Sequence, residues 1–425
     1  MEKFFADLFR LMRQADPSMH NTFLQLIEQE FKREGYREEI SLGVENILIA
    51  RFDVVGDMIL TSGFLREVRK NFPRARITLV CSPLVRPIVE LCPYVNEVLT
   101  FDIKTLGGGG PYNRNFLLML EKLTDFCREN LWQKKFDVAF STQCDGDSFP
   151  LILMTWLSGA RERIGYDFLP YRNYYMKPNA ESDALGKFLL NRMVVPPAEM
   201  CVQAEAHLYL LSGSGFKVNQ THMELWFNEA DAQRAKEFLE VLPSSCKKVV
   251  LGIGAGAPNR KYPPEKLLVA LKELLKKNFV FVAVGGKSEL EAANFLEKNL
   301  PREKVLNLVG QTTLRETEAV IAQSDLYLGN DTGTVHMAAA AHLPVIVIYR
   351  EAIDRDDAFP KFFNNVYKFP PWQTKAILLR PAHPLGECAN MPPVLGTCRY
   401  NAAHCITQIT PQEIVAAFKE LGVRS

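Results

Sequence analysis

The chain has 425 residues, which at roughly 100–200 residues per domain is enough for two domains. Its 50 lysines and arginines nearly balance 49 aspartates and glutamates, so the formal net charge is only +1 and nothing in it favours nucleic-acid binding. No apolar run reaches the ~18–20 residues that cross a bilayer, and charged residues interrupt the amino terminus, which excludes a secretory signal. We therefore expect a cytoplasmic protein whose cysteines are mostly reduced thiols.

Residues 1–44 show the apolar spacing of two amphipathic helices, separated at Asp16, Pro17 and Ser18. We expect this helical extension to pack on the neighbouring domain or in a homo-oligomer. The alternative is peripheral contact with the inner face of the plasma membrane. Acidic residues on the polar face weaken that alternative.

From residue 46 onward, apolar runs typical of buried strands alternate with helical patterns. In the first half, strands are expected at 47–50, 77–81, 97–101 and 136–141, and helices at 65–72, 84–91, 116–132 and 150–159. In the second half, strands are expected at 249–253, 279–284, 305–308, 325–328 and 345–349, and helices at 264–277, 288–299, 314–323 and 334–341. Such alternation predicts an α/β protein with a doubly wound parallel sheet in each half.

This pattern divides the chain into a helical extension, an amino-terminal domain at 45–225 and a carboxyl-terminal domain at 226–425. The region around 205–245 is expected to connect the two domains. The last helix is a candidate to pack back on the first domain.

The first motif follows the strand at 47–50, where the chain continues through Arg51, Asp53, Gly56 and Asp57 into a helical pattern. A carboxylate at the carboxyl end of a buried strand lies where open α/β sheets keep their ligands. Asp57 is therefore our candidate for a catalytic base. Arg51, Asp53 and Gly56 are assigned to the same side of the site.

The second motif runs from Gly329 to His336, after a short apolar strand and before an alanine-rich helix. Asn330 and Asp331 tolerate turn geometry, and Gly333 tolerates any backbone angle. Such a turn presents free backbone N–H groups at a helix start, which suits a phosphate. The residues expected to form this loop are Asp331, Thr332, Gly333, Thr334 and His336. We predict a ligand that carries a diphosphate.

Glycines also follow the strand at 249–253, where Gly254 and Gly256 allow close approach of a ligand to the backbone. The spacing is not that of a GxGxxG fingerprint. Lys261 comes shortly afterwards and is a candidate cation for a phosphate. Glu289 and Glu291 open a later helix, where they either stabilise the helix start or accept hydrogen bonds from sugar hydroxyls.

Cys388, Cys398 and Cys405 lie near His383 and His404, but no CxxC pair occurs among them. We expect structural thiols in a folded tail and no metal at the active site. A site of three cysteines and one histidine is the alternative.

Together these segments resemble glycosyltransferase family 9, the heptosyltransferases of lipopolysaccharide core synthesis. The resemblance covers residues 46–349 and the tail at 404–418. Its two specific motifs are R-x-D-x-x-G-D at Arg51 to Asp57 and D-T-G-x-x-H at Asp331 to His336. Either motif alone is weak, and the two together in this order are quite specific.

The resemblance implies a GT-B fold, in which two Rossmann-like domains face a central cleft. It implies inverting, metal-independent transfer from a nucleotide sugar, typically ADP-heptose, to a glycolipid or glycan hydroxyl, without a further cofactor. By motif position Asp57 matches the catalytic aspartate, and the donor is bound mainly by the carboxyl-terminal domain. The positions that match its donor contacts are Lys261, Glu289 or Glu291, Thr312, Asp331, Thr332, Gly333 and His336.

The chain departs from the family pattern at residues 1–44, at 350–400, and at Thr334, where a proline or a small apolar residue is usual. These departures bear on the sugar and the acceptor rather than on the fold. The rival hypotheses are another nucleotide sugar or a protein or cell-wall acceptor, a nucleotide-sugar epimerase of the same architecture, and a non-catalytic scaffold.

Overall fold

The computed structural model describes residues 43–103, 116–143, 149–166, 189–197, 199–355, 361, 364–390, 398 and 400–422. The helices expected within 1–44 and the glycine run at 107–110 lie outside the described residues, apart from the last two residues of the extension. Their roles stay predictions. Among the described helices, none is long and apolar enough to cross a membrane.

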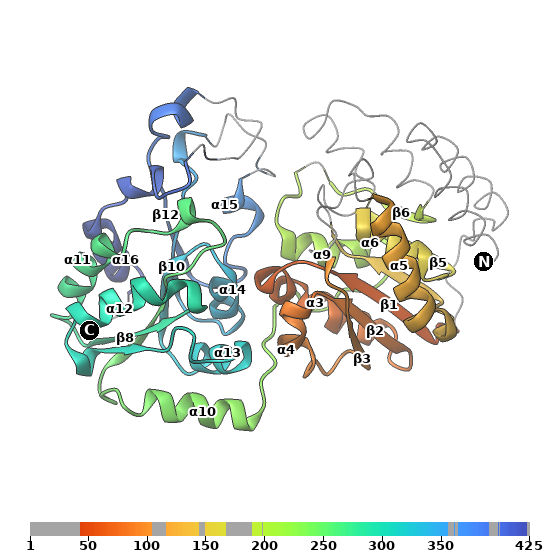
Figure 1. Cartoon of the computed structure of the whole chain (residues 1–425), viewed down its shortest axis with the longest axis horizontal. Coiled ribbons are helices and arrows are strands. Elements are labelled where there is room, and N and C mark those ends of the chain that lie inside the picture. Colours follow the sequence, from red (N-terminus) through yellow and green to blue (C-terminus); the bar gives the residue numbers. More distant parts are fainter. Residues whose placement is uncertain are drawn as a thin grey trace.

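Two parallel sheets, each in its own lobe, form the framework of the described chain (Figure 1). The first has the strand order β3-β2-β1-β4-β5-β6 and the second the order β12-β11-β10-β7-β8-β9. The strands of the first sheet are β1 (Asn46–Arg51), β2 (Arg76–Cys81), β3 (Glu97–Thr100), β4 (Val138–Ser141), β5 (Glu162–Tyr166) and β6 (Arg192–Val194). Those of the second are β7 (Lys247–Gly252), β8 (Phe279–Val284), β9 (Val305–Asn307), β10 (Leu326–Asn330), β11 (Val345–Ile348) and β12 (Ala376–Leu379).

In each sheet the order of connection reverses at one pair of central strands, β1 with β4 and β7 with β10. Ligands of doubly wound sheets bind in the crevice outside such a switch point. Both sequence motifs lie there, because Arg51 ends β1 and Asn330 ends β10. This confirms the predicted fold class of two doubly wound parallel sheets.

Sequence periodicity missed β5, β6 and β12. Strand β5 carries Arg163, which is 3% exposed in the middle of a buried strand. Its guanidinium is satisfied locally by donating from Nε to the Leu189 carbonyl at 2.9 Å and from Nη1 to the Ala160 carbonyl at 2.8 Å. Strand β12 has no fully buried residue, so its apolar pattern is weak.

Helices cover both sheets. Those of the first lobe are α3 (Val55–Asn71), α4 (Arg86–Val89), α5 (Phe116–Asn130), α6 (Phe149–Leu157) and α9 (Gln203–Gly213). Those of the second are α10 (Glu229–Leu239), α11 (Pro264–Leu274), α12 (Leu290–Asn299), α13 (Leu314–Ala322), α14 (Gly333–Ala340), α15 (Asn365–Lys368) and α16 (Pro411–Glu420). Helix α16 packs on α11, β11 and β12, so it stays with the second sheet rather than packing back on the first domain as considered above.

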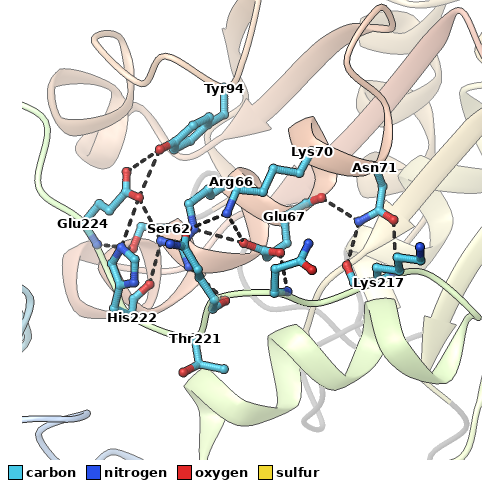
Figure 2. A network of polar contacts seen from close by, with 12 residues as sticks. Ser62, Arg66, Glu67, Lys70, Asn71, Tyr94, Lys217, Thr221, His222 and Glu224 are labelled. Carbon is cyan, nitrogen blue, oxygen red and sulfur yellow. Dashed lines mark hydrogen bonds and ion pairs between the residues drawn. The ribbon is translucent and has the colours of Figure 1, made fainter.

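The segment that joins the lobes is held along α3 by a buried polar network (Figure 2). The Arg66 guanidinium donates to the Gln220 carbonyl at 3.0 Å, the His222 carbonyl at 2.8 Å and the Glu224 carboxylate at 2.8 Å. The Glu67 carboxylate, which is fully buried, accepts from the Arg66 Nε at 3.1 Å. The connector thus belongs structurally to the first lobe as far as Glu224.

The lobes meet where α3 packs on α14 and α4 packs on α13 (Figure 1). Arg315 of α13 forms ion pairs with Glu90 at the end of α4 and with Asp231 of α10. The two switch points therefore face one another across the contact of α3 with α14.

Candidate active site

Arg51 organises the first half of the site. Its side chain is 1% exposed at the end of β1. Its Nε lies 2.9 Å from the Asp53 carboxylate, and its Nη2 lies 3.4 Å from Oδ1 of Asp57. Its Nη1 contacts the Thr142 carbonyl at 3.3 Å and Nε2 of His207 at 3.0 Å. A buried guanidinium with this many partners fixes both carboxylates in place.

His207 of α9 is a residue that sequence reasoning missed. It is fully buried, and its Nδ1 lies 3.1 Å from the Leu60 carbonyl oxygen. A carbonyl can only accept, so Nδ1 carries the proton and Nε2 accepts from Arg51. The imidazole is therefore neutral and acts as a polar support for Arg51. Nothing in the sequence distinguished it, because it falls in the region expected to be a connector.

Asp57 occupies the first turn of α3, where the N-cap residue Val54 provides no side-chain cap. The side chain of Asp57 is 18% exposed, so it is reachable from solvent. Both the helix start and the nearby Arg51 stabilise its carboxylate form. A carboxylate that is charged, fixed and reachable has the properties of a general base.

Asp331 anchors the second half of the site. It is 4% exposed just after β10, and the Arg260 guanidinium bonds its carboxylate and also its carbonyl oxygen, the latter at 2.8 Å. Asn365 lies at the outer limit of hydrogen bonding, 3.5 Å from Oδ2. Burial raises the pKa of Asp331 to about 6, and the charge of Arg260 opposes that rise. Sequence reasoning did not single out Arg260, although its place beside Lys261 after a glycine-rich turn was a signal.

His336 lies in the first turn of α14 and is 4% exposed. Burial, together with the positive charge of Arg260, lowers its pKa to about 4, so the ring is neutral near pH 7. Its Nδ1 is buried and has no hydrogen-bond partner among the described residues. Because an unpaired buried nitrogen costs free energy, this atom is a candidate to bind a ligand or a water.

Asn330 has a different role from the one its residue type suggested. It is not a turn residue but the last residue of β10. Its Nδ2 donates to the carbonyls of Ile253 at 2.9 Å and Gly254 at 3.2 Å, and its Oδ1 accepts from the Tyr262 N–H at 3.0 Å. The side chain thereby fixes the glycine-rich loop after β7 to the loop after β10.

Gly333 also differs from expectation. It is the first residue of α14 and does not have a positive φ. A Cβ on Gly333 would lie 3.0 Å from Cγ1 of Val55, and one on Gly56 would lie 2.8 Å from Cδ2 of His336. Both glycines are required for the close approach of two helices from different lobes, and this approach brings the turn that carries Asp57 next to Gly333 and His336.

Lys261 and Glu289 form an ion pair with Nζ and Oε1 3.0 Å apart. The Ser288 hydroxyl also donates to Glu289 Oε1, at 2.6 Å. Both residues of the pair, with Glu291, line a cavity of about 370 Å³ at the carboxyl ends of β7 and β10. Gly254 makes room for this arrangement, since a Cβ there would lie 3.0 Å from Cδ of Glu289. The cavity has the size and the mixed lining of a small-molecule site.

None of the remaining candidates, Thr334, Gly256 and Thr312, lines this cavity. The Thr334 hydroxyl pairs with the buried Tyr327 hydroxyl at 2.8 Å. The backbone N–H of Thr334 lies at the start of α14, which has no side-chain cap. Gly256 borders open space, since a Cβ there would meet only Nη1 of Arg260, at 3.9 Å. Thr312 pairs with Thr317 at 2.8 Å and is not part of the cavity lining.

With this geometry established, the chain can be compared with known proteins. The sequence profile of glycosyltransferase family 9 (heptosyltransferase) matches residues 175–376. Among curated relatives, lipopolysaccharide heptosyltransferase 2 of Escherichia coli is 23% identical over 314 residues, which is 71% of this chain and 82% of the relative.

Solved structures agree on the fold. A glycosyltransferase family 9 protein from Veillonella parvula superposes with a TM-score of 0.67 at 17% identity, covering 91% of this chain and 100% of the other. ADP-heptose LPS heptosyltransferase II of Escherichia coli gives 0.61 at 19% identity, covering 89% of this chain and 98% of the other. The predicted GT-B fold is confirmed by these similarities.

Proposed function

Because the chain is a glycosyltransferase that belongs to family 9, we propose that it moves a heptosyl group from ADP-heptose to a hydroxyl of a lipopolysaccharide core or related glycan. The observation that carries this proposal is the direct approach of the Asp57 turn to the donor loop at Gly333 and His336. It brings a candidate base and a candidate diphosphate site together from two different lobes.

The donor fits the second lobe. Its nucleoside enters the cavity lined by Glu289 and Glu291, where a carboxylate accepts hydrogen bonds from the ribose hydroxyls. That exchange frees Lys261 from its ion pair with Glu289, and the ammonium then neutralises the diphosphate. The N–H groups at the start of α14 lack a side-chain cap and add to the same charge stabilisation.

In this proposal Asp331 and His336 hold the sugar. The Arg260 guanidinium fixes the orientation of the Asp331 carboxylate, and the unpartnered Nδ1 of His336 supplies one further polar contact. Both groups are buried, so hydrogen bonds to sugar hydroxyls there are made away from water and contribute more to orientation than surface contacts do.

Transfer is a direct displacement at the anomeric carbon. An acceptor hydroxyl oxygen forms the new bond to that carbon while the bond to the diphosphate oxygen breaks, which inverts the configuration. The proton of the acceptor hydroxyl goes to the Asp57 carboxylate, and the electron pair of the broken bond leaves with ADP. Arg51 and the dipole of α3 keep Asp57 ionised before this step.

A calorimetric titration with ADP, UDP, GDP and CDP, without added divalent metal, tests the donor. It is followed by turnover of ADP-heptose with and without a deacylated core-oligosaccharide acceptor, monitored by product mass. Preferred binding of ADP and an acceptor heavier by one heptose support the proposal. Preference for another nucleotide contradicts the donor, and conversion of the donor without acceptor indicates an epimerase. Failure to bind any nucleotide would instead indicate a non-catalytic scaffold.

A further inference from the structure

Three potential metal ligands converge in the tail of the second lobe, outside the cavity described above, and a fourth lies beside one of them. The ligand atoms of Cys388, His404 and Cys405 all lie within 4.8 Å of one another. The Sγ of Cys398 lies 3.9 Å from the Sγ of Cys388. Three separate segments supply these residues, one of them in η11 (Gly386–Asn390) and one in η13 (Cys405–Gln408).

Two of the separations between these atoms match the edges of a tetrahedral metal site. With metal–sulfur bonds of about 2.3 Å, two thiolates on a tetrahedron lie about 3.8 Å apart, and a thiolate and an imidazole nitrogen lie about 3.6 Å apart. The observed separations are 3.9 Å for Cys388 with Cys398 and 3.5 Å for Cys405 Sγ with His404 Nδ1. A disulfide between Cys388 and Cys398 would instead require about 2.05 Å.

The surroundings orient the same ligands. The Leu385 N–H points at the Cys405 sulfur at 3.3 Å, as backbone donors do around metal-bound thiolates. The Tyr400 ring stacks on the His404 imidazole, with centroids 3.9 Å apart and an interplanar angle of 20°. This stacking fixes the ring plane and therefore the direction of its nitrogen atoms.

We propose that Cys388, Cys398, His404 and Cys405 bind one four-coordinate transition-metal ion, in the first place Zn²⁺. Three thiolates and one imidazole are soft ligands that select zinc or iron over magnesium or calcium. Four protein ligands leave no open coordination position, so the ion is structural and takes no part in glycosyl transfer.

The ion would stabilise one wall of the donor site. The Tyr400 carbonyl accepts from Nδ2 of Asn259 at 2.9 Å, and Oδ1 of Asn259 accepts from Arg350 at 2.8 Å. Asn259 directly precedes Arg260, the partner of Asp331. Loss of the ion should therefore loosen this wall and weaken nucleotide binding as a secondary effect.

The test is elemental analysis of the full chain, purified with a tag that lacks histidine and without added chelator. We expect close to one zinc or iron ion per chain, released in full when a mercurial reagent titrates the thiols. Replacement by Co²⁺ should give the thiolate charge-transfer and intense visible bands of tetrahedral cobalt. These measurements use the wild-type protein, so they do not depend on whether a variant folds.

Matched variants locate the ion. Cys388→Ser and Cys405→Ser should lose most of the metal, whereas Cys201→Ser, which changes a half-buried cysteine elsewhere, should retain it. The proposal is wrong if the wild-type protein contains less than about a tenth of an equivalent of metal. It is also wrong if peptide mapping finds Cys388 and Cys398 joined as a disulfide, or if Cys405→Ser keeps as much metal as Cys201→Ser.

Discussion

The two lobes share one strand order, but their switch points differ in how the buried charged and polar side chains are paired. In the first lobe, buried Arg51 is matched by two carboxylates, a backbone carbonyl and His207. In the second, His336 keeps a buried nitrogen without a partner in the part of the chain that the structure describes, and the pKa of Asp331 is raised by burial despite Arg260. The candidate base of the first lobe is thus held by protein groups, whereas in the second lobe one buried nitrogen remains available to a ligand or a water.

A similar contrast appears where α13 meets the connector. Arg66 and Glu67 of α3 are buried but paired with each other and with the connector. Glu318 of α13 is equally buried, and the backbone N–H of Trp226 and the charge of Arg315 only partly offset the cost of ionising it there. Burial raises the pKa of Glu318 to about 8, so this acid is mostly protonated at neutral pH.

The contact between the lobes can be broken with one methyl group. In Gly56→Ala the new Cβ would lie 2.8 Å from the buried His336 ring and close to the backbone of Gly333, so α3 must move away from α14. We expect kcat to fall by about 100-fold, because a displacement of about 1 Å in a reacting group has that effect. The control is Gly43→Ala, whose Cβ meets nothing within 4 Å. Equal activity of the two variants would contradict the proposed approach of Asp57 to the donor loop.

The buried acid Glu318 gives a prediction for stability. The pKa of Glu318 is higher in the folded chain, about 8, than its ordinary 4.5. Below pH 4.5 both states are protonated, and as pH rises toward 8 the unfolded state ionises first, so folding stability falls. Glu318→Gln should remove this loss and stabilise the protein at pH 7 by about 3 kcal/mol, with no gain near pH 4.5.

Thermal unfolding across this pH range measures the effect. The exposed Glu303→Gln is the control and should leave the midpoint nearly unchanged. A Glu318→Gln protein that is less stable than wild type at pH 7 would show that the carboxyl is ionised and paired in the folded state.

The proposed role of Lys261 in donor binding is tested by removing its charge. Lys261→Gln leaves Glu289 without its ion-pair partner and removes a positive charge from the proposed diphosphate site. We expect ADP affinity to fall about 10-fold, which corresponds to roughly 1.4 kcal/mol. Calorimetry compares it with Lys276→Gln, which changes a solvent-exposed lysine paired with Glu273. Unchanged affinity would remove Lys261 from the donor site.

The support that His207 gives to Arg51, the partner of Asp57, is tested by substitution of His207. His207→Leu removes the acceptor for Nη1 of Arg51, whereas His207→Gln offers a carbonyl oxygen in a similar position. We expect a few-fold loss of kcat for the leucine variant with KM for the donor unchanged, and partial recovery for glutamine. Equal loss in both variants would mean that packing, and not the bond to Arg51, accounts for the effect.

The sequence predicted the fold well because buried parallel strands are continuous apolar runs. It missed strands that lack such a run: β5 contains the buried Arg163, and β12 is only partly buried. At the site, the motifs located Asp57 and Asp331 because each follows a central strand. His207 could not be found, since its role depends on a tertiary contact 156 residues from Arg51. Gly333 was identified for the wrong reason: we expected it to supply backbone freedom, whereas it allows two helices to pack closely. A glycine in a sequence does not distinguish these two roles.

Our central claim is that the first lobe supplies the base and the second lobe binds the donor. It is tested most directly by Asp57→Asn, with single-turnover transfer rate and ADP affinity measured on the same preparation. Asparagine keeps the size of the side chain but cannot accept the proton. We predict a rate lower by about 10²–10⁴-fold with ADP affinity unchanged. A retained rate, or an ADP affinity that collapses with the rate, would contradict the claim.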